Sequence, residues 1–328
     1  FAIGSDGIVY TLQVRPLIIN GSMFDHNRDR VIKNTLDKVE SSVNSSHKKD
    51  NLFYGDKTIW SVMADWNPAE IIGVSPSPLA ADLYQELVTK TIWAEQRYEA
   101  GYKDLRGIEL MHLLGGQAYI DVRASLNSFL PYSLDDEICN KIITFGINKL
   151  EEDRSLHDKI EFELIQTCSS FTIDKELEEM INKKVINRNE ASIYRKQLTD
   201  ITINIINRVE DDLELTKIRD EAWLDINHPK DFDPKWLKNI VSQCRDHGVK
   251  TFAHLARAGF VAAKFIKSAV SSNILSQQRA DELMASVDGL GRKISSWAAD
   301  VRDGVKTREE FEQYFGHLRP GTYDINHK

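Results

Sequence analysis

Two segments of the chain, 117–126 and 159–167, alternate charged with apolar residues. The charged positions that the two segments would turn to one side are Asp121 and Arg123 in the first segment and Lys159, Glu161 and Glu163 in the second. A period of two predicts two β-strands, each with one charged face and one core face. If these strands are neighbours in one sheet, the carboxylates can hold an ammonium group and the guanidinium a carboxylate, which predicts a site for a free amino acid. The alternative, which the alternation alone favours, is a solvated sheet face with cross-strand ion pairs.

A third polar segment, 63–73, shifts that balance toward a binding site. It contains Trp66, then Asn67 before a proline, then Glu70 in the first turn of a predicted helix. Helix capping accounts for Asn67 and Glu70 but not for a tryptophan beside a polar turn. Arg97, on a predicted amphipathic helix, is a further candidate, although a surface ion pair is its default interpretation.

The two ends of the chain carry candidates of a different kind. A strand at 1–3, a Ser-Asp-Gly turn at 5–7 and a second strand at 8–16 have the pattern of a β-hairpin, and the second strand places Gln13 and Arg15 on one side. A carboxamide and a guanidinium together can hold a metal ion or a phosphate oxygen. Near the other end, His317 and Arg319 lie in a glycine-containing loop and could contact a substrate. His112 and His254 lie in apolar patterns, where a satisfied core histidine is the expected role.

The composition excludes several classes of function. With 328 residues, 41% hydrophobic and 28% charged, the chain is typical of a soluble globular protein with one large or two ordinary domains. A net charge of −8 without a basic stripe argues against nucleic acid as a partner. Three widely spaced cysteines predict no zinc site and suit a reducing cytoplasm. Neither a signal peptide nor a membrane span is predicted.

The elements that must position these residues predict an α+β fold. We expect a mixed α/β substrate-binding region with a sheet at about 55–171, a mainly α-helical region at 174–328, and a short β segment at the N-terminus. Helices are expected near 30–43, 78–99, 134–151 and 250–271, from Asp233 to Gly248, and from Ser276 and Thr307 onward. Helix 250–271 is apolar around most of its circumference, so it is expected to be central and buried.

The N-terminal strand, 8–16, resembles the closing strand of the ATP-grasp domain of the phosphoenolpyruvate synthase and pyruvate phosphate dikinase family. In that family the matching glutamine helps to hold magnesium and the arginine lies near the nucleotide phosphates, which implies these roles for Gln13 and Arg15. Members of the family combine an ATP-grasp domain, an acceptor domain and a swivelling domain with a phosphorylated histidine.

A longer resemblance covers 55–328 in patches and is to the middle domain of glutamine-kinase-like members of that family. The patches are 64–73, 78–84, 93–104, 119–128, 157–163, 252–267 and 316–324. The resemblance implies that ATP phosphorylates the histidine, which then passes its phosphoryl group to the amide nitrogen of glutamine in bacterial capsular polysaccharide synthesis. It implies three parts: 1–25 as the end of an ATP-grasp domain, 26–54 as a helical segment and linker, and 55–328 as the acceptor domain.

By this resemblance the chain is part of a larger cytoplasmic kinase, inactive by itself. Its cofactors would be ATP and Mg²⁺, and its partners the amino-acid substrate and the ATP-grasp and phosphohistidine domains of the same parent chain. The expected substrate-binding residues are Trp66, Asn67, Glu70, Arg97, Asp121, Arg123, Asn127, Glu161, Glu163, His317 and Arg319. Asp121, Glu161 and Glu163 would hold the ammonium group, and Arg123 or Arg319 the carboxylate. The catalytic residues stay unassigned, because the carrier histidine lies on another domain.

Three alternatives stay open. A rifamycin-type phosphotransferase has the same order of parts but needs a wide apolar pocket. A phosphoenolpyruvate synthase fits less well, since its ATP domain leads directly into the histidine domain. The third alternative is a helical interaction module without a ligand of its own.

Overall fold

The computed structural model describes residues 2–3, 9–10, 26–46, 53–224, 233–287 and 289–316, and every structural statement below refers to these. The chain divides into two compact units, residues 1–45 and 46–328. In the first unit, β1 (Ala2–Ile3) pairs antiparallel with β2 (Val9–Tyr10), which confirms the predicted hairpin. The expected helix near 30–43 is also confirmed, as the longer α1 (His26–Ser46).

The second unit contains a small antiparallel sheet of three strands in the order β3-β5-β4. They are β3 (Trp60–Ser61), β4 (Met111–Leu114) and β5 (Gln117–Asp121). Gly115 and Gly116 join β4 to β5 with φ angles of 61° and 83°. Because both angles are positive, this two-residue turn favours glycine.

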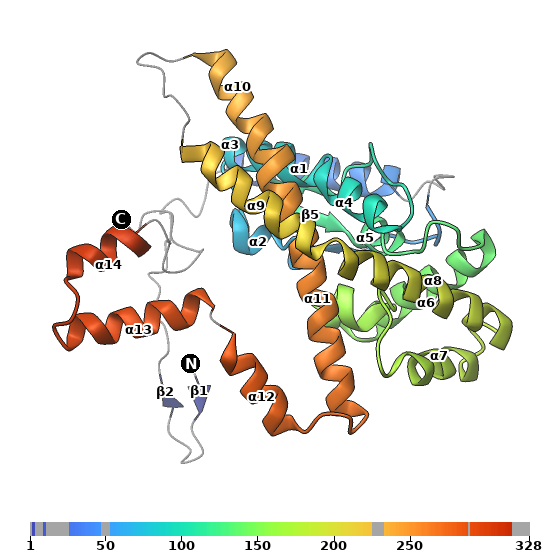
Figure 1. The fold of residues 1–328 in the computed structure, drawn as a ribbon. Coiled ribbons are helices and arrows are strands. Elements are labelled where there is room, and N and C mark those ends of the chain that lie inside the picture. Colours follow the sequence, from blue (N-terminus) through green and yellow to red (C-terminus); the bar gives the residue numbers. More distant parts are fainter. Residues whose placement is uncertain are drawn as a thin grey trace. The chain divides into compact units, whose positions relative to one another are not determined.

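Helices make up most of the second unit, and together with the small sheet they confirm the predicted α+β fold class (Figure 1). Those before residue 165 are α2 (Pro68–Ile71), α3 (Pro78–Tyr84), α4 (Ile92–Ala100), α5 (Val122–Asn127) and α6 (Asp136–Glu152). The following ones are α7 (Ile173–Asn182), α8 (Arg188–Asn207), α9 (Val209–Leu224), α10 (Pro234–Gln243), α11 (Lys250–Ser271), α12 (Gln277–Ser286), α13 (Leu290–Arg302) and α14 (Arg308–Phe315). Short helical turns of other types are η1 (Gln85–Thr89), η2 (Arg154–Leu156), η3 (Ile160–Leu164) and η4 (Cys244–Val249).

Several helix ends follow the predicted signals. Asp233 caps α10 with Pro234 in its first turn, and Ser276 caps α12. Thr307 and Glu310 form a reciprocal capping box at α14. The bounds predicted for helices 134–151 and 250–271 are confirmed within two residues by α6 and α11.

The second predicted strand, 159–167, is wrong. Residues Ile160–Leu164 form the π-helical turn η3, with Ile160 and Leu164 both buried in the core. Residues four apart share a face in a helical turn as well as in a strand, so the alternation could not separate the two. The first predicted strand is also shorter than expected, because Asp121 caps α5 and the chain turns helical at Val122.

Three helix predictions need correction. The expected helix 78–99 is divided into α3, η1 and α4, with a new start at Thr91. Gly248 does not end a helix, because the π-helical turn η4 carries the chain from α10 into α11. Helix α11 is not buried all round: Phe252 is 61% exposed and Phe260 37% exposed, whereas His254 and Arg257 are buried.

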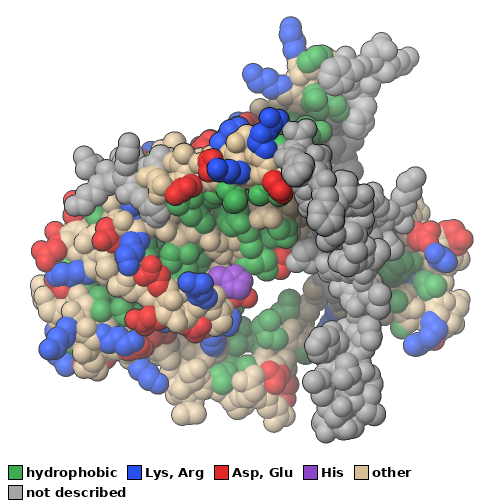
Figure 2. All heavy atoms as spheres, turned by 180° about the vertical axis from the view of Figure 1, so that it is seen from behind, with side chains coloured by type: hydrophobic (Ala, Val, Ile, Leu, Met, Phe, Trp, Pro, Cys, Tyr) green, Lys and Arg blue, Asp and Glu red, His purple; other side chains and the backbone are tan. Residues whose placement is uncertain are grey.

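The core of the second unit lies where β4, β5 and the helices α4 to α8 meet. Its largest fully buried side chains include Trp93, Tyr102, Phe129 and Tyr194. Helix α11 packs against α4, α8 and α9 (Figure 1). On the face drawn in Figure 2, acidic and basic side chains are interspersed around an area of hydrophobic ones. Within the described residues, no helix combines the length and apolar character that crossing a membrane requires.

Candidate functional site

A buried ion pair joins Arg97 of α4 to Asp65, in the loop before α2. Nη2 of Arg97 donates to both carboxylate oxygens of Asp65, at 2.6 and 2.7 Å. Ser125 adds a third hydrogen bond to that carboxylate at 2.6 Å, and Nη1 of Arg97 donates to Ser128. Burial alone would raise the pKa of Asp65, but the Arg97 guanidinium and these hydrogen bonds hold it below its ordinary value. Asp65 is therefore ionised, and its oxygens are already engaged.

The backbone around Asp65 takes an unusual conformation. Asp65, Trp66 and Asn67 have positive φ angles of 20°, 60° and 28°. Three such residues in a row are costly without glycine, so the surrounding contacts must hold them. The Arg97 pair holds the first, the Tyr84 hydroxyl donates to the carbonyl of Trp66, and the Asn67 side chain accepts from the Glu70 amide at 3.3 Å. This bend turns the Trp66 side chain to the pocket described below.

Glu161, in η3, is a second buried carboxyl group beside Arg97. Its Oε1 lies 3.8 Å from Nη2 of Arg97, and its Oε2 is buried without a hydrogen-bond partner among the described residues. Burial, and then the charge of Asp65, raise the pKa of Glu161 to about 8. Two neighbouring carboxyl groups with pKa values driven apart are a common basis for acid–base chemistry. At neutral pH Glu161 is therefore protonated, and a cation bound beside it would favour loss of this proton.

Arg257, in the middle of α11, brings a second buried guanidinium to the same place. Its Nη2 donates to the carbonyl of Thr167 at 3.1 Å, while its Nε and Nη1 are buried and lack partners in the described structure. The guanidinium carbons of Arg97 and Arg257 lie 4.0 and 4.9 Å from the centre of the Phe129 ring. Contact with the ring stabilises both cations, yet leaves two nitrogens of Arg257 unsatisfied.

These groups line a pocket of about 130 Å³. Its polar walls are Gln96, Arg97, Glu161 and Arg257, and its aromatic walls are Trp66, Phe129, Phe252 and Phe260. Gln96 also has a buried amide nitrogen without a partner within the described ranges. Buried polar atoms are nearly always paired in folded proteins, so several orphans in one pocket mark a place where a ligand completes the bonding.

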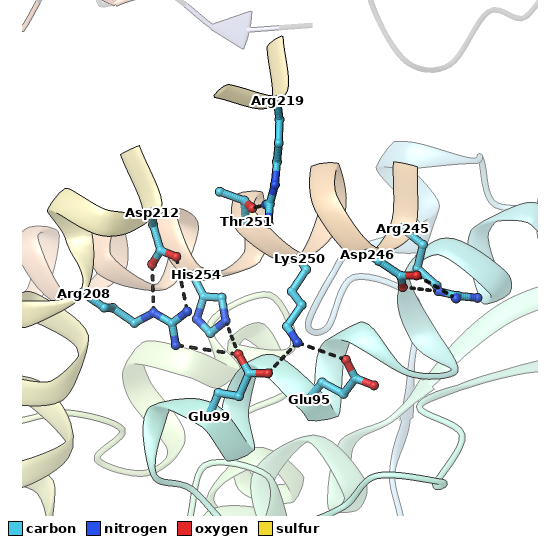
Figure 3. A network of polar contacts seen from close by, with 10 residues as sticks. All are labelled: Glu95, Glu99, Arg208, Asp212, Arg219, Arg245, Asp246, Lys250, Thr251 and His254. Carbon is cyan, nitrogen blue, oxygen red and sulfur yellow. Dashed lines mark hydrogen bonds and ion pairs between the residues drawn. The ribbon is translucent and has the colours of Figure 1, made fainter. Parts of the chain in front are cut away.

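The helices that carry the two arginines are fastened by a network of ion pairs (Figure 3). Glu99 of α4 accepts from Lys250 at 2.5 Å and lies 3.0 Å from Nε2 of His254, both on α11. Arg208 lies 3.8 Å from Glu99 and pairs with Asp212 of α9 at 2.9 Å. Burial, and then the Arg208 charge, lower the pKa of His254. The predicted role of His254 as a satisfied core histidine is confirmed, and the network holds Arg257 opposite Arg97.

The structure brings together three of the residues predicted from the sequence. Trp66, Arg97 and Glu161 line the pocket. The surface ion pair assumed by default for Arg97 is wrong, because its side chain is only 4% exposed. Asn67 and Glu70 lie at the start of α2, where Asn67 is the cap and Glu70 is exposed.

The other predicted residues lie elsewhere, because the shared charged sheet face does not exist. Asp121 caps α5 through the Ala124 amide at 3.0 Å, and burial raises its pKa. Arg123 donates to the carbonyl of Gly55 at 3.3 Å, and Asn127 bonds the main chain of Tyr54 at 2.9 and 3.0 Å. These contacts fasten the segment that precedes β3.

Glu163 points to a different hollow and pairs with Lys267 at 2.9 Å. His112 packs edge to face with Trp60 on the sheet, at 4.9 Å between ring centroids. Gln13, Arg15, His317 and Arg319 lie outside the described residues. The nucleotide and magnesium roles that the resemblance implies for Gln13 and Arg15 therefore stay predictions. In the described ranges, no group of three His, Cys, Asp or Glu side chains could hold a metal ion.

Sequence reasoning missed several residues of the site: Asp65, Gln96, Ser125, Phe129 and Arg257. Arg257 left one signal, because it is one of three cations, with Lys264 and Lys267, that interrupt the apolar segment 252–270. The exposed aromatic residues of α11 left another, since Phe252 and Phe260 belong to the pocket wall and not to the core. Asp65 gave no local signal, because its partner is 32 residues away.

Comparisons with protein-family models, curated proteins and solved structures gave no match. The chemistry of the pocket is therefore the main support for the function proposed next.

Proposed function

We propose that the pocket binds a free α-amino acid, with L-glutamine as the first candidate, and that the chain is the acceptor-binding domain of an ATP-dependent phosphotransferase. The proposed ligand is supported by two buried groups on the pocket walls that lack hydrogen-bond partners among the described residues. They are the carboxyl oxygen Oε2 of Glu161 and two nitrogens of Arg257. The phosphotransferase part is supported by the family resemblance alone.

Each group of the amino acid has a partner of matching charge. The α-carboxylate bonds to Arg257, since a guanidinium is the strongest partner for a carboxylate. The α-ammonium bonds to Oε2 of Glu161, which is ionised when the ligand arrives. The amide nitrogen of Gln96 can donate to the side-chain carbonyl of glutamine. Phe252 and Phe260 cover the aliphatic part.

The contribution of such a domain to phosphoryl transfer is positioning, since the transfer needs little covalent chemistry from the acceptor site. ATP and Mg²⁺ belong to the ATP-grasp and phosphohistidine domains of the proposed parent chain, in the cytoplasm, with capsular polysaccharide synthesis as the proposed context. A volume of about 130 Å³ is small for the macrocycle of a rifamycin-type acceptor.

The test is thermal unfolding of the chain with added L-glutamine. A ligand that binds only the folded state stabilises it, by about 2.7 kcal/mol at one hundred times its Kd. We expect a saturable rise in Tm with L-glutamine and none with N-acetyl-L-glutamine, which lacks the ammonium, or with L-glutamine amide, which lacks the carboxylate. If no free amino acid raises the Tm, the proposal fails and a helical interaction module is the remaining candidate.

A further inference from the structure

One edge of the sheet is open at β3. In the order β3-β5-β4, β3 has a neighbour on one side only among the described residues. The amide of Val122 donates to the carbonyl of Ile59 at 3.0 Å, and Trp60 faces Asp121. Hydrogen-bonded and non-hydrogen-bonded pairs alternate along an antiparallel ladder, so Trp60 and Asp121, next to the bonded pair of Ile59 and Val122, form a non-hydrogen-bonded pair. The main-chain N–H and C=O of Trp60 therefore point away from β5.

A second pocket, of about 530 Å³, lies along this edge. The four consecutive residues 59–62 all line it, although their side chains alternate between the two faces of the sheet. The pocket therefore follows the strand edge and not one face. Leu150, Arg154 and His157 line it as well. The volume lies in the usual range for small-molecule sites.

Most of the residues that line this pocket have a polar side-chain group, Ser61 and His157 among them. The indole N–H of Trp60 is buried and has no partner in the described part of the chain. Tyr119 adds a second aromatic ring to the wall. Glu151 is compensated by Lys57 at 3.1 Å, whereas Arg154 is an exposed residue that forms no ion pair with any described residue. The uncompensated charge at the pocket is thus positive.

We propose that this second pocket binds a planar heteroaromatic ring that carries an anionic group, as a nucleoside monophosphate does. The ring packs against Trp60 and Tyr119, and its donor and acceptor atoms pair with the main-chain N–H and C=O of Trp60. The anionic group bonds to Arg154. An added peptide strand is less suitable, because β3 is only two residues long. This proposal is independent of the amino-acid pocket.

Isothermal titration of the chain with AMP, GMP, CMP and UMP tests it. We expect at least one nucleotide to bind saturably, the matching nucleoside to bind roughly tenfold more weakly, as for the loss of one charged contact, and inorganic phosphate not to bind. Arg154→Gln should bring nucleotide affinity down to that of the nucleoside, without changing nucleoside affinity. Arg188→Gln, an exposed arginine elsewhere, is the matched control.

Val62→Trp, which fills the pocket, should abolish binding of both nucleotide and nucleoside, provided that its Tm shows a folded chain. The proposal is overturned if no nucleotide binds at millimolar concentration, if phosphate binds as tightly as the nucleotide, or if Arg154→Gln behaves as Arg188→Gln does. Because these titrations contain no L-glutamine, a negative result would overturn the nucleotide proposal and would not test the proposed amino-acid site.

Discussion

Glu161 lies 3.8 Å from Arg97, yet the guanidinium gives its hydrogen bonds to Asp65 and Ser128. The closest cation is thus already committed, and burial raises the pKa of Glu161 to about 8. The carboxyl group of Glu161 is therefore neutral while the pocket is empty, and it becomes charged when a ligand cation lies beside it.

The first prediction concerns binding. Glu161→Gln should weaken L-glutamine binding by about 1.5–3 kcal/mol, roughly 10- to 150-fold, because an amide offers no charge to the ammonium. Isothermal titration measures this. Glu163→Gln is the matched control, since Glu163 lies in another hollow and should leave the Kd unchanged. An unaltered Kd in Glu161→Gln would remove Glu161 from the binding site.

The second prediction concerns the buried ion pair. Arg97→Met should lower the free energy of unfolding by about 3–5 kcal/mol, because it leaves Asp65 ionised and buried without its partner. Adding Asp65→Asn to that variant should recover part of the loss. Urea unfolding measures both. A loss of only about 1 kcal/mol, the size of an exposed ion pair, would contradict the buried role.

The third prediction concerns pH. A carboxyl group whose folded-state pKa exceeds its unfolded value binds more protons when folded, so stability falls as pH rises between the two values. For Glu161 the interval runs from its ordinary pKa of 4.5 to about 8. The difference in Tm between wild type and Glu161→Gln should therefore change across this interval, in favour of the variant at higher pH. A constant difference from pH 5 to pH 8 would mean that Glu161 titrates normally.

The fourth prediction concerns proton release. Because an empty pocket holds a protonated Glu161 and the bound ligand favours the carboxylate, binding near neutral pH should release about one proton per ligand. Titrations in buffers of different ionisation enthalpy count this proton. Glu161→Gln should release none, and equal heats in all buffers for the wild type would refute the exchange.

Local patterns predicted the helices well and the site poorly. Capping residues such as Ser276 and Thr307 act within one turn, so their effect is visible in the sequence. The turn around Glu161 was mistaken for a strand because its buried residues are four apart. The meeting of Arg97 with Arg257 depends on packing between helices 160 positions apart, which no local period encodes. Trp66 was found because an aromatic residue beside a polar turn has no local explanation.

The π-helical turn η4 has a consequence for the register of the helices that it joins. A π-helical turn contains one residue more than an α-helical turn. The side chains of α10 are therefore rotated by about 100° about the helix axis, relative to where one uninterrupted α-helix continuing from α11 would place them. Helix α11 is anchored on α4 by Glu99, Lys250 and His254. Deleting one residue within Cys244–Val249 would consequently leave the arginine of the pocket in place and rotate α10 about its own axis, which presents a different side of that helix to its surroundings.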